Sequence, residues 1–217
     1  MSEHDPTMAE AVAEYRRANG FPEDGGAGER VAKVKLGPLV MPVPNIRARA
    51  EALPRHDLHH TLLGCDSSFR GEAIVGAWEV AAGCGRFWVA TFFGAQAAFH
   101  GLFVCPRETV RAFALGRRSR TLYHGPWDDG WLATRRSALR ARLLPAEAPR
   151  PGLADLALYL AWAGLGLLFV ALFLAAIALP TLAFSARELL VSRRTGRTAY
   201  PPSRSRSVAG NHAKAAW

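Results

Sequence analysis

The chain is poor in cysteine. Cys65, Cys84 and Cys105 cannot all pair, and no two of them have the CxxC spacing of a thiolate metal site. A disulfide framework and a thiolate zinc knuckle are therefore disfavoured, and a reducing compartment is indicated. The chain also lacks internal repeats and low-complexity composition, because half of its 217 residues are hydrophobic and 21% are charged. This composition predicts a globular domain with an appendage.

Charge is absent from a long stretch near the C-terminus. No Asp, Glu, Lys or Arg occurs from Leu156 to Ala186. A spanning helix needs about 20 apolar residues and two spans would need about 40, so the stretch predicts one membrane segment. Because Pro180 lacks a backbone donor, we expect the helix to kink or stop there, or the segment to enter one leaflet and return. The alternative is a buried helix of a soluble domain.

The N-terminus lacks the apolar core of a signal peptide, since MSEHDPTMAEAVAEYRRANG is acidic and amphipathic. The helical domain is therefore expected on the cytoplasmic side of its membrane, which is the inner membrane if the chain is bacterial. Arginines flank the apolar segment on both sides, including Arg142 and Arg150 before it and Arg187 and Arg193 after it. A single pass would place one basic flank on the far side, whereas a re-entrant segment would keep both on the cytoplasmic face.

The net charge of +9 has two interpretations. The arginines lie beside the apolar segment and lack an interleaved pattern of aromatic residues on which bases would stack. Their charge therefore indicates contact with a membrane surface, and no nucleic-acid partner is expected.

No stretch of strict alternation of polar and apolar residues is long enough to compel a sheet. Apolar residues recur at helical spacing, which predicts an all-α fold: a compact helical domain with a C-terminal transmembrane or re-entrant helix. The span from Ala73 to Val104 is interrupted by polar residues, and we interpret it as two buried or interfacial helices. We expect five regions: a flexible acidic lead (1–29), the helical domain (30–145), a Pro-rich hinge (146–155), the membrane segment (156–186) and a disordered basic tail (187–217).

The motif RHDLHHTLLG carries the chemical signal. His56 and His60 are four residues apart, so on a helix both project from one face and can share a cation. Asp57 could supply an oxygen ligand or orient an imidazole. Glu72 would lie ~18 Å further along an unbroken helix, so a turn at 64–68 must return it, in the first turn of an antiparallel helix, to the histidines. Two histidines and two carboxylates suit Zn²⁺, Mn²⁺ or Fe²⁺.

Other interpretations of the motif exist. HDLHH alone is compatible with a solvated polar helix face, and His59 is expected to support the ligands or to lie on the surface. An HD-type phosphohydrolase needs a further upstream histidine, and His4 in the N-terminal lead is the only one. Cys65 is the one cysteine next to the motif.

HDLHH followed by eleven residues and Glu72 matches the HDxxH-x11-E signature of the ubiquinone-biosynthesis family called coenzyme Q biosynthesis protein four. Residues 40 to 125 resemble its divergent bacterial members. The resemblance implies an all-helical fold and a divalent metal, most often zinc, at His56, Asp57, His60 and Glu72. Two features depart from the family: His59 stands where an aromatic residue is common, and the C-terminal apolar segment is additional.

The resemblance further implies work at the membrane on long-tailed quinone precursors, and a link to loss of the ring carboxyl from a prenylated hydroxybenzoate. The leading hypothesis is thus a membrane-associated, metal-dependent protein of ubiquinone biosynthesis, acting as a decarboxylase (a lyase). A water near the metal, or His59, is a candidate proton donor. The alternative is a non-catalytic lipid-binding scaffold that organises biosynthetic enzymes. Expected partners are a prenylated quinone precursor or another lipid, the membrane, other quinone-biosynthesis enzymes and a second copy of the chain.

Overall fold

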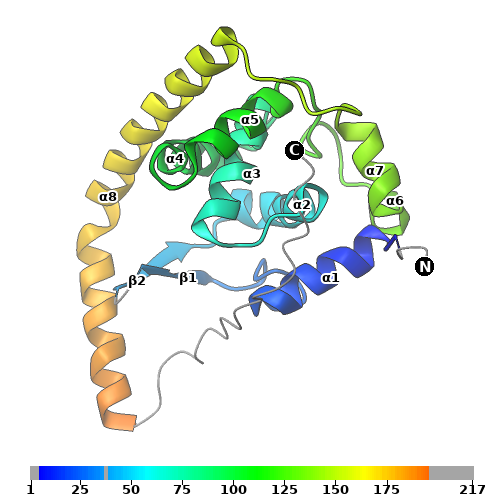
Figure 1. Ribbon diagram of the computed structural model, residues 1–217. Coiled ribbons are helices and arrows are strands. Elements are labelled where there is room, and N and C mark those ends of the chain that lie inside the picture. The colour runs from blue at the N-terminus through cyan, green and yellow to red at the C-terminus, as the bar shows by residue number, and fades with distance from the viewer. Residues whose placement is uncertain (1–4, 37–38, 196–217) are drawn as a thin grey trace.

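The computed structural model describes residues 5–36 and 39–195. These residues form a helical domain with one small hairpin, and a long helix runs along its side (Figure 1). The elements are α1 (Met8–Asn19), β1 (Val31–Leu36), β2 (Leu39–Pro44), α2 (Arg47–Leu63), α3 (Phe69–Ala82), α4 (Trp88–Val104), α5 (Pro106–Gly116), α6 (Gly130–Ala133), α7 (Arg136–Leu143) and α8 (Leu153–Thr195). The all-α prediction is confirmed.

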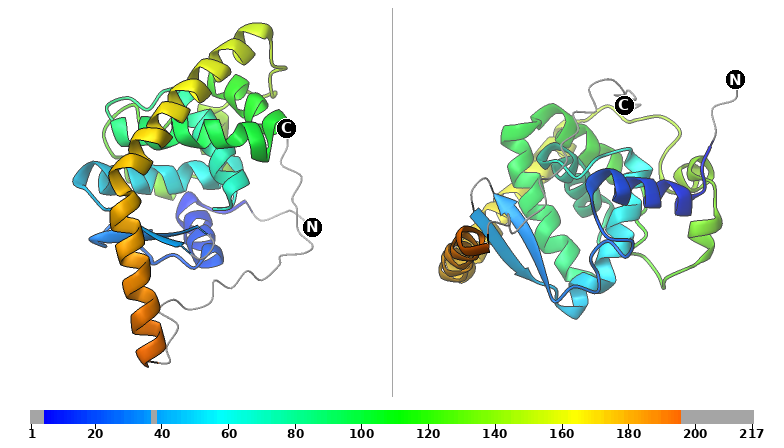
Figure 2. Two further views of the ribbon diagram at one scale, coloured as in Figure 1. Left: turned by 90° about the vertical axis from the view of Figure 1, so that its left-hand side faces the viewer. Right: turned by 90° about the horizontal axis from the view of Figure 1, so that it is seen from below.

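The hairpin is the one departure from helix within the described elements. β1 and β2 pair antiparallel, with Val31 opposite Pro44 and Leu36 opposite Leu39. Each strand has six residues, too few for an alternating pattern to stand out in the sequence. Because a two-stranded hairpin is marginal alone in water, it depends on its neighbours. β2 lies beside α8, as both views in Figure 2 show.

Helix α3 is the centre of the domain and packs against α4 and α5. Glycines allow the close approach of α3 and α4: a Cβ on Gly76 would lie 3.1 Å from the Gly94 oxygen, and a Cβ on Gly94 would lie 3.2 Å from the Gly76 oxygen. Trp78 of α3 is fully buried and belongs to a core cluster that includes Ala112 and Leu115 of α5. This packing fixes the helix that carries both carboxylates of the site described below.

Helix α1 lies in the region expected to be a flexible lead, and here the expectation is wrong. Thr7 caps the helix by accepting a hydrogen bond from the Glu10 amide, and the Glu10 side chain in turn accepts from the Thr7 amide. Met8 and Val12 are buried in a cluster with Leu58 of α2. The N-terminal helix is therefore part of the domain, because its apolar face completes the packing of the helix that carries the histidines.

Helix α8 continues through Pro180 without ending or turning back within the described chain. It extends beyond the expected segment (156–186), beginning in the expected hinge and including residues 187–195 of the expected tail. The rest of that tail, 196–217, lies outside the described residues. The stretch Leu153–Ala176 of α8 is long and apolar enough to cross a membrane. At its start, Asp155 forms ion pairs with Arg117 and Arg118 near the end of α5.

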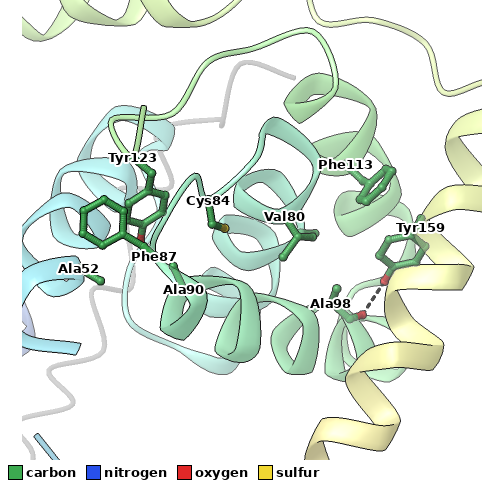
Figure 3. Packing of buried hydrophobic residues seen from close by; sticks show 10 residues of the cluster. Ala52, Val80, Cys84, Phe87, Ala90, Ala98, Phe113, Tyr123 and Tyr159 are labelled. Carbon is green, nitrogen blue, oxygen red and sulfur yellow. Dashed lines mark hydrogen bonds between the residues drawn. The ribbon is translucent and has the colours of Figure 1, made fainter. Parts of the chain in front are cut away.

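The first half of α8 packs against α4. Tyr159 is fully buried, and its hydroxyl donates to the Ala98 oxygen at 2.9 Å (Figure 3). The same hydroxyl lies 2.9 Å from Thr109 Oγ1 of α5. The helix that the sequence marks as a membrane segment is therefore also a packed element of the domain.

Two glycines of α8 provide a matched test of this packing. A Cβ on Gly166 would lie 2.0 Å from the Ala95 oxygen, whereas a Cβ on Gly164 would meet nothing within 4 Å. We expect Gly166→Ala to lower the free energy of unfolding by about 1–3 kcal/mol, because α8 must move away from α4. Gly164→Ala is expected to cause no loss. Denaturant unfolding in mild detergent measures both, and equal effects would show that α8 is not held against α4.

Candidate metal centre

The turn between α2 and α3 brings the motif together. α2 ends at Gly64, which adopts a left-handed conformation (φ 69°), and Ser68 caps α3 by accepting a hydrogen bond from the Gly71 amide. Glu72 consequently lies in the first turn of α3, beside the histidines of α2. This arrangement confirms the turn that the spacing predicted.

The three side chains His56, His60 and Glu72 offer ligand atoms that all lie within 4.8 Å of one another. The two Nε2 atoms are 3.1 Å apart. His56 Nε2 lies 3.3 Å from Glu72 Oε2, and His60 Nε2 lies 3.3 Å from Glu72 Oε1. Two imidazole lone pairs repel at this separation unless a proton or a cation lies between them. The donor set of two nitrogens and a carboxylate fits a divalent metal ion.

Asp57, the fourth predicted ligand, is not in this group. Its Oδ2 accepts a hydrogen bond from Arg16 Nε at 2.8 Å. A Cβ on Gly25 would lie only 2.4 Å from the same oxygen, so the loop after α1 closes over it. Successive residues of a helix point about 100° apart, which turns Asp57 toward α1 while His56 faces α3. The structure therefore brings together three of the four predicted ligands.

The sequence analysis missed Glu79, which lies behind the ligands. The side chain is buried, and its Oε1 accepts three hydrogen bonds: from His56 Nδ1 (2.9 Å), His59 Nδ1 (2.6 Å) and the Tyr123 hydroxyl (3.0 Å). The signal was present, because Glu79 follows Glu72 by two helical turns and interrupts an apolar run. A carboxylate that orients a metal-binding histidine is a recurrent part of such sites.

These bonds determine the proton positions on two histidines. His56 donates its Nδ1 proton to Glu79, so that in the neutral ring the Nε2 lone pair is directed at the ligand group. His59 accepts at Nε2 from the Leu122 amide (2.9 Å), so its proton must be on Nδ1 and the ring is neutral. His59 is fully buried, with both nitrogens occupied. It therefore supports Glu79 and is not available as a proton donor to a substrate.

Helix α1 covers the other side of the group. The Tyr15 ring stacks on the His60 ring with centroids 5.1 Å apart, and Asn19 accepts a hydrogen bond from the Ser67 amide in the turn before α3. The Glu72 side chain is 41% exposed, so the site is open on the Glu72 side. Cys65 lies in the same turn but is not part of the ligand group, and burial raises the pKa of its thiol to about 12.

A pocket of about 680 Å³ lies between α1, α2 and the α6 region. Its walls are largely apolar, with Val12 and Leu58 among them, and two arginines (Arg16 and Arg17) and two carboxylates (Glu23 and Asp24) add charges of both signs. Arg16 lines this pocket and also donates the hydrogen bond to Asp57. The pocket has the size of a small-molecule site.

Opposite pKa shifts at two histidines predict a maximum of stability. Burial lowers the pKa of His59 in the folded chain. Below pH 6.5 the unfolded chain therefore binds a proton at His59 that the folded chain does not bind, and the free energy of unfolding decreases as the pH falls. Burial alone would lower the pKa of His56, but Glu79 and Glu72 outweigh it and raise the pKa well above 6.5. The stabilisation that charged His56 contributes is complete below pH 6.5. It is lost as the pH rises through the pKa that His56 has in the folded chain.

We therefore expect the metal-free protein to be most stable near pH 6.5. Denaturant midpoints in the presence of a chelator, at about one pH unit on either side, measure this. His56→Ala should remove the alkaline decline and leave the acidic one. A stability that rises steadily through this range in the unsubstituted protein would contradict the shift at His56.

Comparisons of the chain with protein-family models, with curated proteins and with solved structures gave no match.

Proposed function

We propose that this chain is a membrane-associated, metal-dependent protein of ubiquinone biosynthesis that removes the ring carboxyl of a prenylated hydroxybenzoate. The observation that carries the proposal is the convergence of His56, His60 and Glu72 at the spacing HDxxH-x11-E. Zinc is the metal that the resemblance favours. When bound, it supplies a Lewis acid for the carboxylate or phenolate of the head group.

The residues around the ligand group support a site of this kind. Glu79 holds His56 with its Nε2 toward the group, and His59 and Tyr123 hold Glu79. Tyr15 covers His60, which leaves the exposed side of Glu72 as the approach for a head group. Burial and the charges of Glu72 and Asp57 raise the pKa of Tyr15, so this phenol keeps its proton beside the site.

The surroundings also suit a ligand with a long apolar part. The pocket between α1 and α2 has largely apolar walls, and α8 supplies an apolar helix of membrane-spanning length. A polyprenyl tail partitions into lipid, so a membrane-associated domain meets such a substrate at high local concentration.

A carboxyl-labelled prenylated hydroxybenzoate in mixed micelles tests the proposal. Metal-loaded protein should release labelled CO₂, with a proton taking the place of the carboxyl on the ring. If the Tyr15 phenol supplies that proton, the Tyr15→Phe variant should release CO₂ more slowly. Lipid extracts of the purified protein should contain a prenylated phenol or quinone. A co-purifying lipid without CO₂ release would favour the scaffold, and absence of both would contradict a role in this pathway.

A further inference from the structure

Helix α8 has two faces of different character. The side toward the domain carries the buried Tyr159 and, further along, the buried Ser185. The opposite side carries leucines that are half exposed, including Leu160 (49%), Leu172 (57%) and Leu182 (57%). No described element packs over this outer face, which continues the length of the uncharged stretch.

Helix α4 extends the same apolar surface. Trp88 (59% exposed) and Phe103 (73% exposed) lie on one face of α4 with Phe92 and Phe99 between them. The Phe92 ring packs against Phe173 of α8, with centroids 5.9 Å apart. The aromatic stripe of α4 therefore runs beside α8 and widens its leucine face into one surface.

The chemistry of this surface fits a lipid bilayer. An exposed apolar surface of this length is unusual for a protein in water. Arg150 before α8 and Arg187 beyond its uncharged stretch are both exposed. Basic residues at both ends match the anionic headgroups of a single leaflet.

The packing of α8 shows how the helix meets the bilayer. Beside its second half lies β2, and a two-stranded hairpin has open edges whose polar backbone groups do not occur in contact with hydrocarbon. Beside its first half lie α4 and, behind it, α5, which exposes Arg111. A helix crossing the membrane in this packing would carry both the hairpin and α5 into the bilayer.

We infer that α8 lies in the plane of the membrane, with its leucine face and the aromatic stripe of α4 in one leaflet. The domain and its metal centre then remain on the same side as both ends of the helix. This arrangement rests on the membrane association in the proposed function and not on the metal chemistry.

Cysteine labelling in bacterial cells tests the inference on the full chain. In a Cys65→Ala background, which leaves only the buried thiols of Cys84 and Cys105, single cysteines are introduced as Leu153→Cys, Leu190→Cys and Ala141→Cys. The first two report the ends of α8, and the third, on the exposed face of α7, reports the side of the domain. A membrane-impermeant maleimide is added to spheroplasts and to inverted inner-membrane vesicles.

We expect all three positions to be labelled in inverted vesicles and none in spheroplasts. Labelling of the 190 position from the side opposite the 141 position would overturn the inference, because the helix would then cross the membrane. Recovery of the protein in the soluble fraction would overturn both the inference and the membrane association. The CO₂ assay would still test the metal chemistry independently.

Vesicle flotation gives a second measurement. Leu168→Glu together with Leu172→Glu places two charges on the outer face without touching the packed side of α8. Binding of the purified chain to vesicles of phosphatidylcholine and phosphatidylglycerol should fall by at least about tenfold. Ala138→Glu together with Ala141→Glu, matched in charge but on the exposed face of α7, should bind like the unsubstituted protein. Equal binding by the double variant would show that another surface contacts lipid, and a lipid-free dimer broken by the same variant would identify a second copy as the occupant.

Discussion

Replacing His60 by alanine is expected to remove divalent metal from the protein. His60 Nε2 is 3.1 Å from the same atom of His56 and 3.3 Å from Glu72, so the substitution deletes one of three converging ligand atoms. With two ligands left, we expect the affinity to fall at least about a hundredfold, because a metal site depends on its full ligand set. Elemental analysis of protein purified in detergent should find about one metal ion per chain in the unsubstituted protein and essentially none in the variant.

His100→Ala is the matched control. This histidine is exposed on α4, away from the ligand group, and should leave the metal content unchanged. His60→Gln, which keeps a polar side chain, separates loss of the ligand from loss of packing. Metal retained at full stoichiometry in His60→Ala, with the fold intact by circular dichroism, would assign the metal to a different site.

Replacing Glu79 should affect both stability and metal affinity. In Glu79→Ala, the donors of His56, His59 and Tyr123 lose their shared acceptor in the buried interior. Breaking a buried network of this kind costs about 3–5 kcal/mol, and we expect a reduction of that size in the free energy of unfolding. Denaturant unfolding with a chelator present measures the effect separately from metal binding.

Glu79→Gln tests the other function of the carboxylate. The amide keeps the size and one acceptor but loses the charge, so His56 is held less firmly and is a weaker ligand. Metal affinity should fall about 10–100-fold while the protein still folds. Glu147→Gln, at an exposed position, serves as the control. Unchanged affinity in Glu79→Gln would mean that Glu79 stabilises the fold without tuning the metal site.

Part of the site could be predicted from local sequence. The spacing of His56 and His60 puts both on one helix face, and Gly64 and Ser68 signal the end of one helix and the start of the next. These are properties of short segments, so the position of Glu72 beside the histidines followed from them and is confirmed.

The partners of these residues could not be predicted in the same way. Asp57 is in contact with Arg16, which lies on a helix expected to be flexible, and Glu79 receives a hydrogen bond from Tyr123, 44 residues away. The sequence also marked α8 by its lack of charge, but nothing local indicated that one of its sides packs on α4 through Gly166.

The sequence by itself determined the helical architecture, the uncharged helix and the position of Glu72 beside His56 and His60, because each depends on residues a few turns apart. Only the tertiary structure decided which carboxylate supports His56, what Asp57 binds and which face of α8 is left exposed. Those outcomes depend on helices distant in the chain packing together, and helical periodicity gives the faces of a helix without their partners.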